Sequence, residues 1–168
     1  HWTGITPAIS EGAAQCCLDA IKTANELGIP VSGDINSRKN MWKYGKSMQE
    51  VMPALVDRCD IVITGTRGIR EMFGLGQEGG KFRHSAKALM EAFPKIKKVI
   101  GKTRKSLSAS HQQIQGKMWN GKQYIKTEMF NITHVVDRVG TGDAYAAGLV
   151  YGLLHYPDDD LQALSFAS

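Results

Sequence analysis

Segments with helical periodicity alternate with short apolar segments along the chain as far as residue 102. The periodic segments predict helices at residues 8–27, 47–58 and 85–93, and the apolar segments predict strands at residues 29–35, 60–64 and 97–102. Such an alternation is typical of right-handed βαβ units, in which parallel strands form a sheet that helices cover. The chain is therefore predicted to be an α/β protein with a mainly parallel sheet flanked by helices.

Local signals mark where some of these elements begin and end. Pro7 suits the first turn of a helix, and Gly28 suits the end of one. Residues 65–80 are rich in glycine and are expected to begin with a turn and a short helix. Residues 107–132 favour short strands, with Asn120-Gly121 as a hairpin signal between two of them. Further helices are expected at residues 142–154 and 161–168.

Composition narrows the classes of protein. The chain is mildly basic, with 21 lysine and arginine residues against 16 acidic ones. The basic residues are spread along the chain and do not cluster with aromatic side chains, so no nucleic-acid partner is expected. The longest strongly apolar run, residues 144–154, is too short to span a bilayer, and no membrane partner is expected. Cys16, Cys17 and Cys59 are odd in number and lack metal-ligand spacing, which favours a reducing cytoplasm over a disulfide framework or a zinc site.

One glycine-rich turn contains residues suited to anion binding and proton transfer. Gly140, Thr141 and Gly142 lead directly into the helix expected at residues 142–154, with Asp143 in its first turn. Glycines let the backbone bend and approach a ligand, and the N–H groups of a helix start attract anions such as phosphate. A carboxylate beside a phosphate can accept the proton of an attacking hydroxyl. Taken alone, the four residues favour an aspartate that only stabilises the start of a helix.

The longer segment from Asp137 to Gly148 resembles the C-terminal signature of the ribokinase-like (PfkB) carbohydrate kinases. In that signature an Asp, two further residues and a Gly-x-Gly-Asp turn precede a helix of small residues. The resemblance implies a three-layer ribokinase-like fold and the ATP-dependent phosphorylation of a sugar hydroxyl, with Mg²⁺ bridging the ATP phosphates. It makes the turn at Gly140, Thr141 and Gly142 an anion hole for the transferring phosphoryl group of the bound nucleotide. It makes Asp143, which meets the substrate hydroxyl, the catalytic base.

A second segment, residues 31–42, resembles the Asp-x-Asn-x-Arg…Leu-Trp stretch of the 2-keto-3-deoxygluconate kinase branch. Asp34, Asn36 and Arg38 stand at the polar positions of that stretch. The resemblance implies that Arg38 holds the carboxylate of a sugar acid, a group that a guanidinium binds with two parallel hydrogen bonds. The substrate would then be 2-keto-3-deoxygluconate or a similar sugar acid, phosphorylated at its terminal hydroxyl. The alternative is that Arg38 only forms an ion pair within the protein.

A third segment, residues 103–110, resembles the stretch that borders the nucleotide in this branch. The resemblance implies that Arg104 and Ser106 approach the ATP phosphates or ribose, although a solvated surface explains the segment equally well. Asp137 and Arg138 flank the glycine turn and are expected to order it or to meet phosphates.

One segment departs from the family pattern. After the strand that ends near Thr64, the family usually has Asn-x-x-Glu or Asn-Glu-Glu-Asp, whose acidic residues help to place magnesium and phosphate. Residues 65–71 here read Gly-Thr-Arg-Gly-Ile-Arg-Glu. Arg67 and Arg70 reverse the local charge, and Glu71 is out of register with the family glutamate. No metal-ligating residue is therefore assigned.

The resemblance covers essentially the whole chain but only about half of a family member. The family's N-terminal sugar-binding strand and lid are not found, so residues 1–168 are expected to form the central and C-terminal portion of a sugar kinase domain. The sequence does not decide whether the protein forms a homo-oligomer. It also leaves two other functions open: a kinase of a neutral sugar such as fructose or ribose, and a non-catalytic nucleotide-binding relative. A dinucleotide-dependent oxidoreductase is disfavoured, because no Gly-x-Gly-x-x-Gly follows a first strand.

Overall fold

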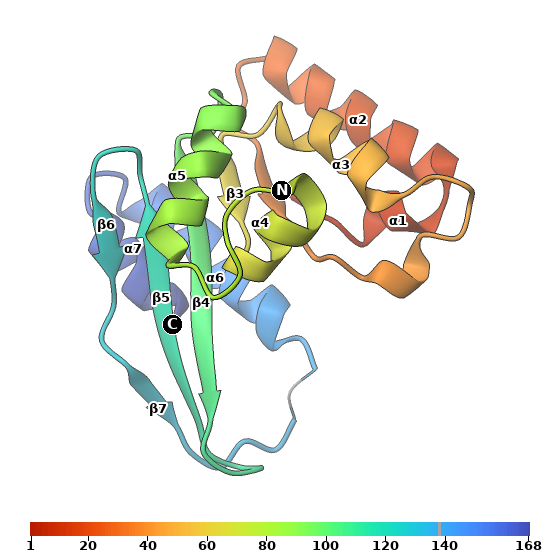
Figure 1. Ribbon diagram of the computed structural model, residues 1–168. Helices are drawn as coiled ribbons and strands as arrows, with labels where there is room; N and C mark the ends of the chain where they lie inside the picture. Colours follow the sequence, from red (N-terminus) through yellow and green to blue (C-terminus); the bar gives the residue numbers. More distant parts are fainter. Residues whose placement is uncertain (138) are drawn as a thin grey trace. The chain divides into compact units, whose positions relative to one another are not determined.

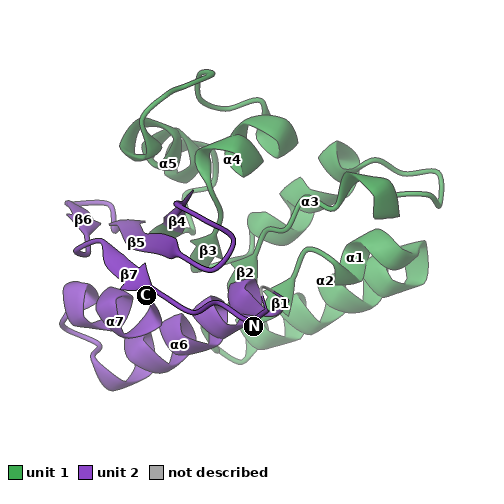
Figure 2. Cartoon of the chain, turned by 90° about the horizontal axis from the view of Figure 1, so that it is seen from below, with its two compact units in different colours: residues 1–100 green, residues 101–168 purple. Residues whose placement is uncertain are grey.

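The computed structural model describes residues 1–137 and 139–168. The chain divides into two compact units, residues 1–100 and residues 101–168, which Figure 2 shows in different colours. Unit 1 contains β1 (Trp2–Thr3), α1 (Thr6–Ile9), α2 (Glu11–Glu26), β2 (Ser32–Asp34), the 3₁₀ turn η1 (Lys39–Met41), α3 (Met48–Val56), β3 (Ile61–Ile63), α4 (Thr66–Phe73), α5 (Phe82–Ala92) and the start of β4 (Lys98–Ser106) (Figure 1). Unit 2 contains the rest of β4, β5 (Gln112–Trp119), β6 (Tyr124–Lys126), β7 (Phe130–Ile132), α6 (Thr141–His155) and α7 (Asp160–Ala167).

The strands of unit 1 form a parallel sheet in the same order as in the chain, β1-β2-β3-β4. Gly33 of β2 lies opposite Trp2 on one side and Val62 on the other, and Val62 lies opposite Val99 of β4. Crossovers between parallel strands are right-handed, so this sequential order places the connecting helices on one face of the sheet. Accordingly, each helix from α1 to α5 packs against the next one along the chain. The predicted parallel α/β arrangement is confirmed for this unit.

A buried carboxylate ties the entry of β2 to the strands beside it. Asp60 is 7% exposed, and its Oδ2 accepts hydrogen bonds from the Val31 N–H at 3.0 Å and from Lys95 Nζ at 2.7 Å. Its Oδ1 lies 3.0 Å from Lys97 Nζ. Burial alone would raise the pKa of Asp60, but these hydrogen bonds outweigh burial and lower that pKa below its ordinary value. Asp60 is thus held ionised in the fold.

Unit 2 has antiparallel pairing. β5 pairs with β6 through residues 117–119 and with β7 through residues 112–114. The β5–β6 hairpin turns at Asn120, whose side-chain oxygen accepts hydrogen bonds from the N–H groups of Lys122 and Gln123. This confirms the hairpin predicted at Asn120-Gly121. α6 and α7 pack against each other, and α7 also packs against β5 and β6.

The single helix predicted over residues 8–27 is wrong, because Ser10 divides this segment into α1 and α2. Ser10 has an extended backbone, with φ −161° and ψ 164°, and its side chain accepts a hydrogen bond from the Ala13 N–H at 3.1 Å. This is the geometry of an N-cap, which starts a new helix. The predicted ends of the segment are confirmed: Pro7 lies in the first turn of α1, and Gly28 follows α2.

Several short elements and boundaries differ from the prediction. β1 and η1 were not predicted, α5 begins at Phe82 and not at residue 85, and β4 continues past residue 102 to Ser106. Strand β1 exists through its pairing with β2, which local sequence does not reveal. Within the described ranges, none of the helices is both long and apolar enough to cross a membrane.

Candidate active site

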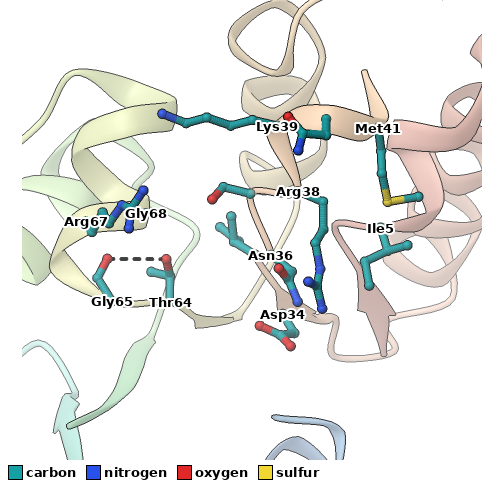
Figure 3. A pocket seen from close by; sticks show the side chains of 13 residues that line it. Ile5, Asp34, Asn36, Arg38, Lys39, Met41, Thr64, Gly65, Arg67 and Gly68 are labelled. Atoms are coloured by element: carbon teal, nitrogen blue, oxygen red, sulfur yellow. Dashed lines mark hydrogen bonds between the residues drawn. The ribbon is translucent and has the colours of Figure 1, made fainter. Parts of the chain in front are cut away.

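A cavity of about 1010 Å³ opens at the carboxyl ends of β2 and β3 in unit 1 (Figure 3). Residues 34–41, which include the last residue of β2, form most of its lining, and Ile5, the turn between β3 and α4, and the start of α4 supply the rest. Parallel α/β sheets bind ligands at this end of their strands. Of the predicted substrate-binding residues, the cavity brings together Asp34, Asn36 and Arg38.

Hydrogen bonds from both neighbouring strands fix the backbone that follows β2. On one side, the Gly4 N–H donates to Asp34 O at 2.8 Å. A Cβ atom on Gly4 would lie 2.9 Å from the backbone nitrogen of Asn36, so the close approach requires glycine. On the other side, the Ile35 N–H donates to Ile63 O at 2.8 Å, which continues the β2–β3 pairing by one residue. The backbone that carries Asp34 and Asn36 is therefore held in place.

Arg38 lies just before η1 and projects its side chain into the cavity. Its carbonyl accepts the Met41 N–H at 2.9 Å, which closes the 3₁₀ turn. Figure 3 shows the Arg38 side chain extending toward Asn36. Among the residues that the structure describes, the Arg38 guanidinium has no ion-pair or hydrogen-bond partner. Its five N–H donors are thus available to an anionic ligand.

A second group of charges borders the same cavity. Arg67 Nε donates to Glu71 Oε1 at 2.9 Å, and Lys39 Nζ lies 3.1 Å from the same oxygen. The Glu71 side chain is 13% exposed, whereas those of Lys39 and Arg67 are 58% and 79% exposed. The hydrogen bonds from Arg67 and Lys39 hold the pKa of Glu71 below its ordinary value. Glu71, out of register with the family glutamate in the sequence, is therefore engaged in an ion-pair network.

The glycine turn of unit 2 has the left-handed backbone that glycine favours. Gly140 has φ 76° and ψ −4° and is the N-cap residue of α6. Just before it, the Val139 N–H donates to Asp137 Oδ1 at 2.9 Å. Arg138, expected to flank the turn, lies outside the described residues.

The start of α6 presents backbone donors. The first intrahelical hydrogen bond runs from the Ala144 N–H to Gly140 O at 2.8 Å. The N–H groups of Gly142 and Asp143 come before that of Ala144 in the chain and belong to the unbonded donors of a helix start. Gly140 to Asp143 are all exposed. The arrangement offers N–H donors, a helix dipole and a carboxylate within one turn of chain.

Lys102 adds a positive charge beside this turn. Its Nζ donates to Thr141 O at 3.2 Å and lies 4.6 Å from the ring centroid of Tyr145. Tyr145 is buried and donates its hydroxyl to Gly101 O at 3.2 Å, which anchors the first turn of α6 to β4. Burial raises the pKa of this tyrosine well above its ordinary value. The sequence prediction missed Lys102, although its position at the end of the strand predicted at residues 97–102 was a usable signal.

Arg104 and Ser106 lie on the later part of β4, in unit 2, and are exposed. Ser106 Oγ donates to Gln112 Oε1 at 2.6 Å, and Gln112 Nε2 donates to Ser108 O at 2.9 Å. Gln112 is buried, so Ser106 has a structural hydrogen bond of its own. The contacts of Arg104 and Ser106 with a nucleotide stay a prediction.

Comparison with known proteins gives a match over nearly the whole chain. The family model described as pfkB family carbohydrate kinase matches residues 8–168. A curated protein from Haloferax volcanii, 2-dehydro-3-deoxygalactonokinase, is 25% identical over 154 residues, which are 92% of this chain and 44% of that protein.

Solved structures share the fold. The 2-dehydro-3-deoxygluconokinase of Thermotoga maritima is 31% identical with a TM-score of 0.85, and the match covers 99% of this chain and 51% of that one. A PfkB family carbohydrate kinase of Listeria grayi is 28% identical with a TM-score of 0.86, covering 98% of this chain and 50% of that one. These neighbours confirm the ribokinase-like α/β fold, and the chain spans about half the length of the relatives that it matches.

Proposed function

The chain belongs to the pfkB family of carbohydrate kinases, and we propose that the protein transfers the terminal phosphoryl group of ATP to a 2-keto-3-deoxy sugar acid. The proposed acceptor is the terminal hydroxyl of 2-keto-3-deoxygluconate or a close relative, in keeping with the names of the Haloferax and Thermotoga proteins. The observation that carries the proposal is Arg38, a guanidinium in the cavity with no partner among the described residues. A sugar acid brings the carboxylate that such a guanidinium binds with two hydrogen bonds, and a neutral sugar does not.

Residues at the start of α6 perform the proposed phosphoryl transfer. Asp143 takes the proton of the acceptor hydroxyl as the hydroxyl oxygen bonds to phosphorus, and ADP leaves with the bond to its former phosphoryl group broken. The backbone N–H groups of the turn at Gly140, Thr141 and Gly142 stabilise the negative charge on the transferring group. In enzymes, a single such donor contributes about 3 kcal/mol. Lys102, beside the turn, adds positive charge near the phosphates.

Arg104 and Ser106 border the nucleotide. Mg²⁺ neutralises charge between the ATP phosphates when it is bound. The described residues include no cluster of His, Cys, Asp and Glu side chains able to hold a metal ion, so the metal is proposed to reach the protein with ATP.

The three free cysteines fit a reducing compartment, and we assign the protein to the cytoplasm.

A coupled assay of ADP release with a panel of acceptors tests the proposal. The panel contains 2-keto-3-deoxygluconate, 2-keto-3-deoxygalactonate, fructose and ribose. We expect the highest kcat/KM with one of the two acids. A preference for fructose or ribose would replace the proposal by a kinase of neutral sugars, and ATP binding without sugar-dependent ADP release would identify a non-catalytic relative.

The role of Asp143 has its own test. Asp143→Asn keeps the size of the side chain but removes the base, so kcat should fall about 100-fold or more. An unchanged kcat would remove Asp143 from the mechanism.

A further inference from the structure

Among the described residues, three cationic side chains line the cavity, and one carboxylate engages two of them. Arg38, Lys39 and Arg67 are the cations, and Glu71 holds Lys39 and Arg67 through one oxygen. We propose that Glu71 is a positioning residue for Arg38: it fastens the turn that carries Arg38 to α4 and leaves Arg38 as the uncommitted guanidinium. This inference rests on the proposed function, since it concerns how the sugar acid is held.

Glu71 is itself firmly placed. It lies one helical turn after Arg67, so the two side chains share a face of α4. The Gln49 side chain, from α3, donates to Glu71 O at 2.9 Å and ties the backbone of α4 to α3. With its side chain 13% exposed, the Glu71 carboxylate is screened less by solvent than an ordinary surface pair is. Glu71 therefore offers Lys39 a fixed anchor.

The turn that carries Arg38 needs such an anchor. Residues 38–40 are exposed, and η1 is a single 3₁₀ turn closed by the hydrogen bond from the Met41 N–H to Arg38 O. Figure 3 shows the Lys39 side chain reaching from this turn toward α4. Because Lys39 and Arg38 are adjacent in the chain, holding Lys39 restricts the backbone of Arg38. Most of the entropic cost of ordering Arg38 then falls on folding and not on ligand binding.

Glu71 also decides which cation meets the ligand. Without it, Lys39 and Arg67 would both present uncompensated charge at the cavity and would compete with Arg38 for a carboxylate. The predicted result of losing Glu71 is a sugar acid that binds more weakly and in mixed orientations. ATP binding does not depend on this link, because the residues proposed to contact ATP are others.

Glu71→Gln tests the inference, with Glu78→Gln as the matched control. Glu78 undergoes the same chemical change, but its side chain is 90% exposed and pairs only loosely with Arg70, at 3.5 Å. Glu71→Gln should raise KM for the sugar acid about 5- to 10-fold, as expected for two partly exposed ion pairs, and should change kcat and the KM for ATP less than about twofold. The control should change none of the three. An unchanged KM for the sugar acid in Glu71→Gln overturns the inference.

A double-mutant cycle shows whether Glu71 acts through Arg38. If it does, adding Glu71→Gln to Arg38→Ala should raise KM for the sugar acid by less than about twofold beyond the single Arg38→Ala variant. Independent, multiplying effects would contradict the inference. Lys39→Met removes the same link from the other end and should reproduce the KM change, which guards against a Glu71→Gln variant that folds poorly.

Hydrogen exchange without any ligand separates this inference from the proposed function. The amides of residues 38–41 should exchange faster in Glu71→Gln than in the wild-type protein and in Glu78→Gln. Unchanged exchange would overturn the fastening role even in an active kinase. If the wild-type protein phosphorylates no sugar acid, the proposed function fails, and the exchange experiment alone decides whether Glu71 fastens the turn.

Discussion

Replacing Gly142 with alanine is expected to stabilise the fold and to impair catalysis at the same time. Gly142 is the second residue of α6, and a Cβ atom there would meet no other atom within 4 Å. Alanine is more favourable than glycine in a helix by about 0.5–1 kcal/mol. Because Gly142 lies in the first turn of α6, we expect a gain in the free energy of unfolding near the lower value. The melting temperature should therefore rise by about 1–2 °C.

The expected loss of activity comes from the same open space. In the proposed mechanism, the transferring phosphoryl group occupies that space in order to reach the N–H groups of Gly142 and Asp143. A methyl group there would hold the phosphate away from these donors. Removal of one backbone or side-chain donor to a developing negative charge lowers kcat by about 100-fold or more in enzymes, and we expect a similar fall here.

The chain offers a matched control in Gly12. Gly12 is the second residue of α2, and a Cβ atom there would also meet no atom within 4 Å. Gly12→Ala should therefore give the same rise in melting temperature with an unchanged kcat. Thermal unfolding and the coupled ADP-release assay measure the two quantities. A Gly142→Ala variant that melts higher and keeps kcat within about threefold of the wild type would refute the phosphate site at the start of α6.

Three further predictions concern binding, stability and thiol reactivity. Arg38→Ala should raise KM for the sugar acid about 10- to 100-fold in steady-state kinetics, the usual effect of losing a charged hydrogen-bond donor, while KM for ATP stays constant; equal rises in both would make Arg38 a structural residue. Asp60→Ala should lower the free energy of unfolding in urea by about 2–3 kcal/mol, since it leaves Lys95 and a buried N–H group without their acceptor. Because the pKa of Asp60 is lower in the folded than in the unfolded chain, this stabilisation is fully present above about pH 4 and is lost as the pH falls through the folded pKa. A difference between variant and wild type that stays constant down to about pH 2 would contradict this linkage. Finally, a thiol reagent should label the exposed Cys16 quickly and Cys59 slowly, because burial raises the pKa of Cys59 to about 11; equal labelling rates would contradict the burial of Cys59.

The sequence predicts the parts of the fold that depend on local pattern. Strands β2, β3 and β4 follow from apolar segments between periodic ones, and the β5–β6 hairpin follows from Asn120-Gly121. The break at Ser10 was missed because alanines on either side continue the helical pattern across the capping residue. β1 and η1 were missed because elements of two or three residues owe their conformation to neighbouring strands and turns, not to their own composition.

The same division applies to the candidate site. That Asp34, Asn36 and Arg38 line one cavity could be predicted, because they stand at the end of one strand in one short motif. The pairing of Lys39 with Glu71 could not, since it joins two segments that lie far apart in the sequence and meet only in the fold. Long-range ion pairs leave no periodic signal, so their residues look like ordinary surface charges.

The sequential strand order of unit 1 is compatible with folding during synthesis on the ribosome. Each new strand of β1 to β4 docks on the edge formed by its predecessor, and no later strand has to insert between two earlier ones. Each step then closes a single crossover, whose entropic penalty is smaller than that of a connection spanning several elements. A nascent chain could therefore add one strand and its covering helices at a time while the remainder is still being synthesised.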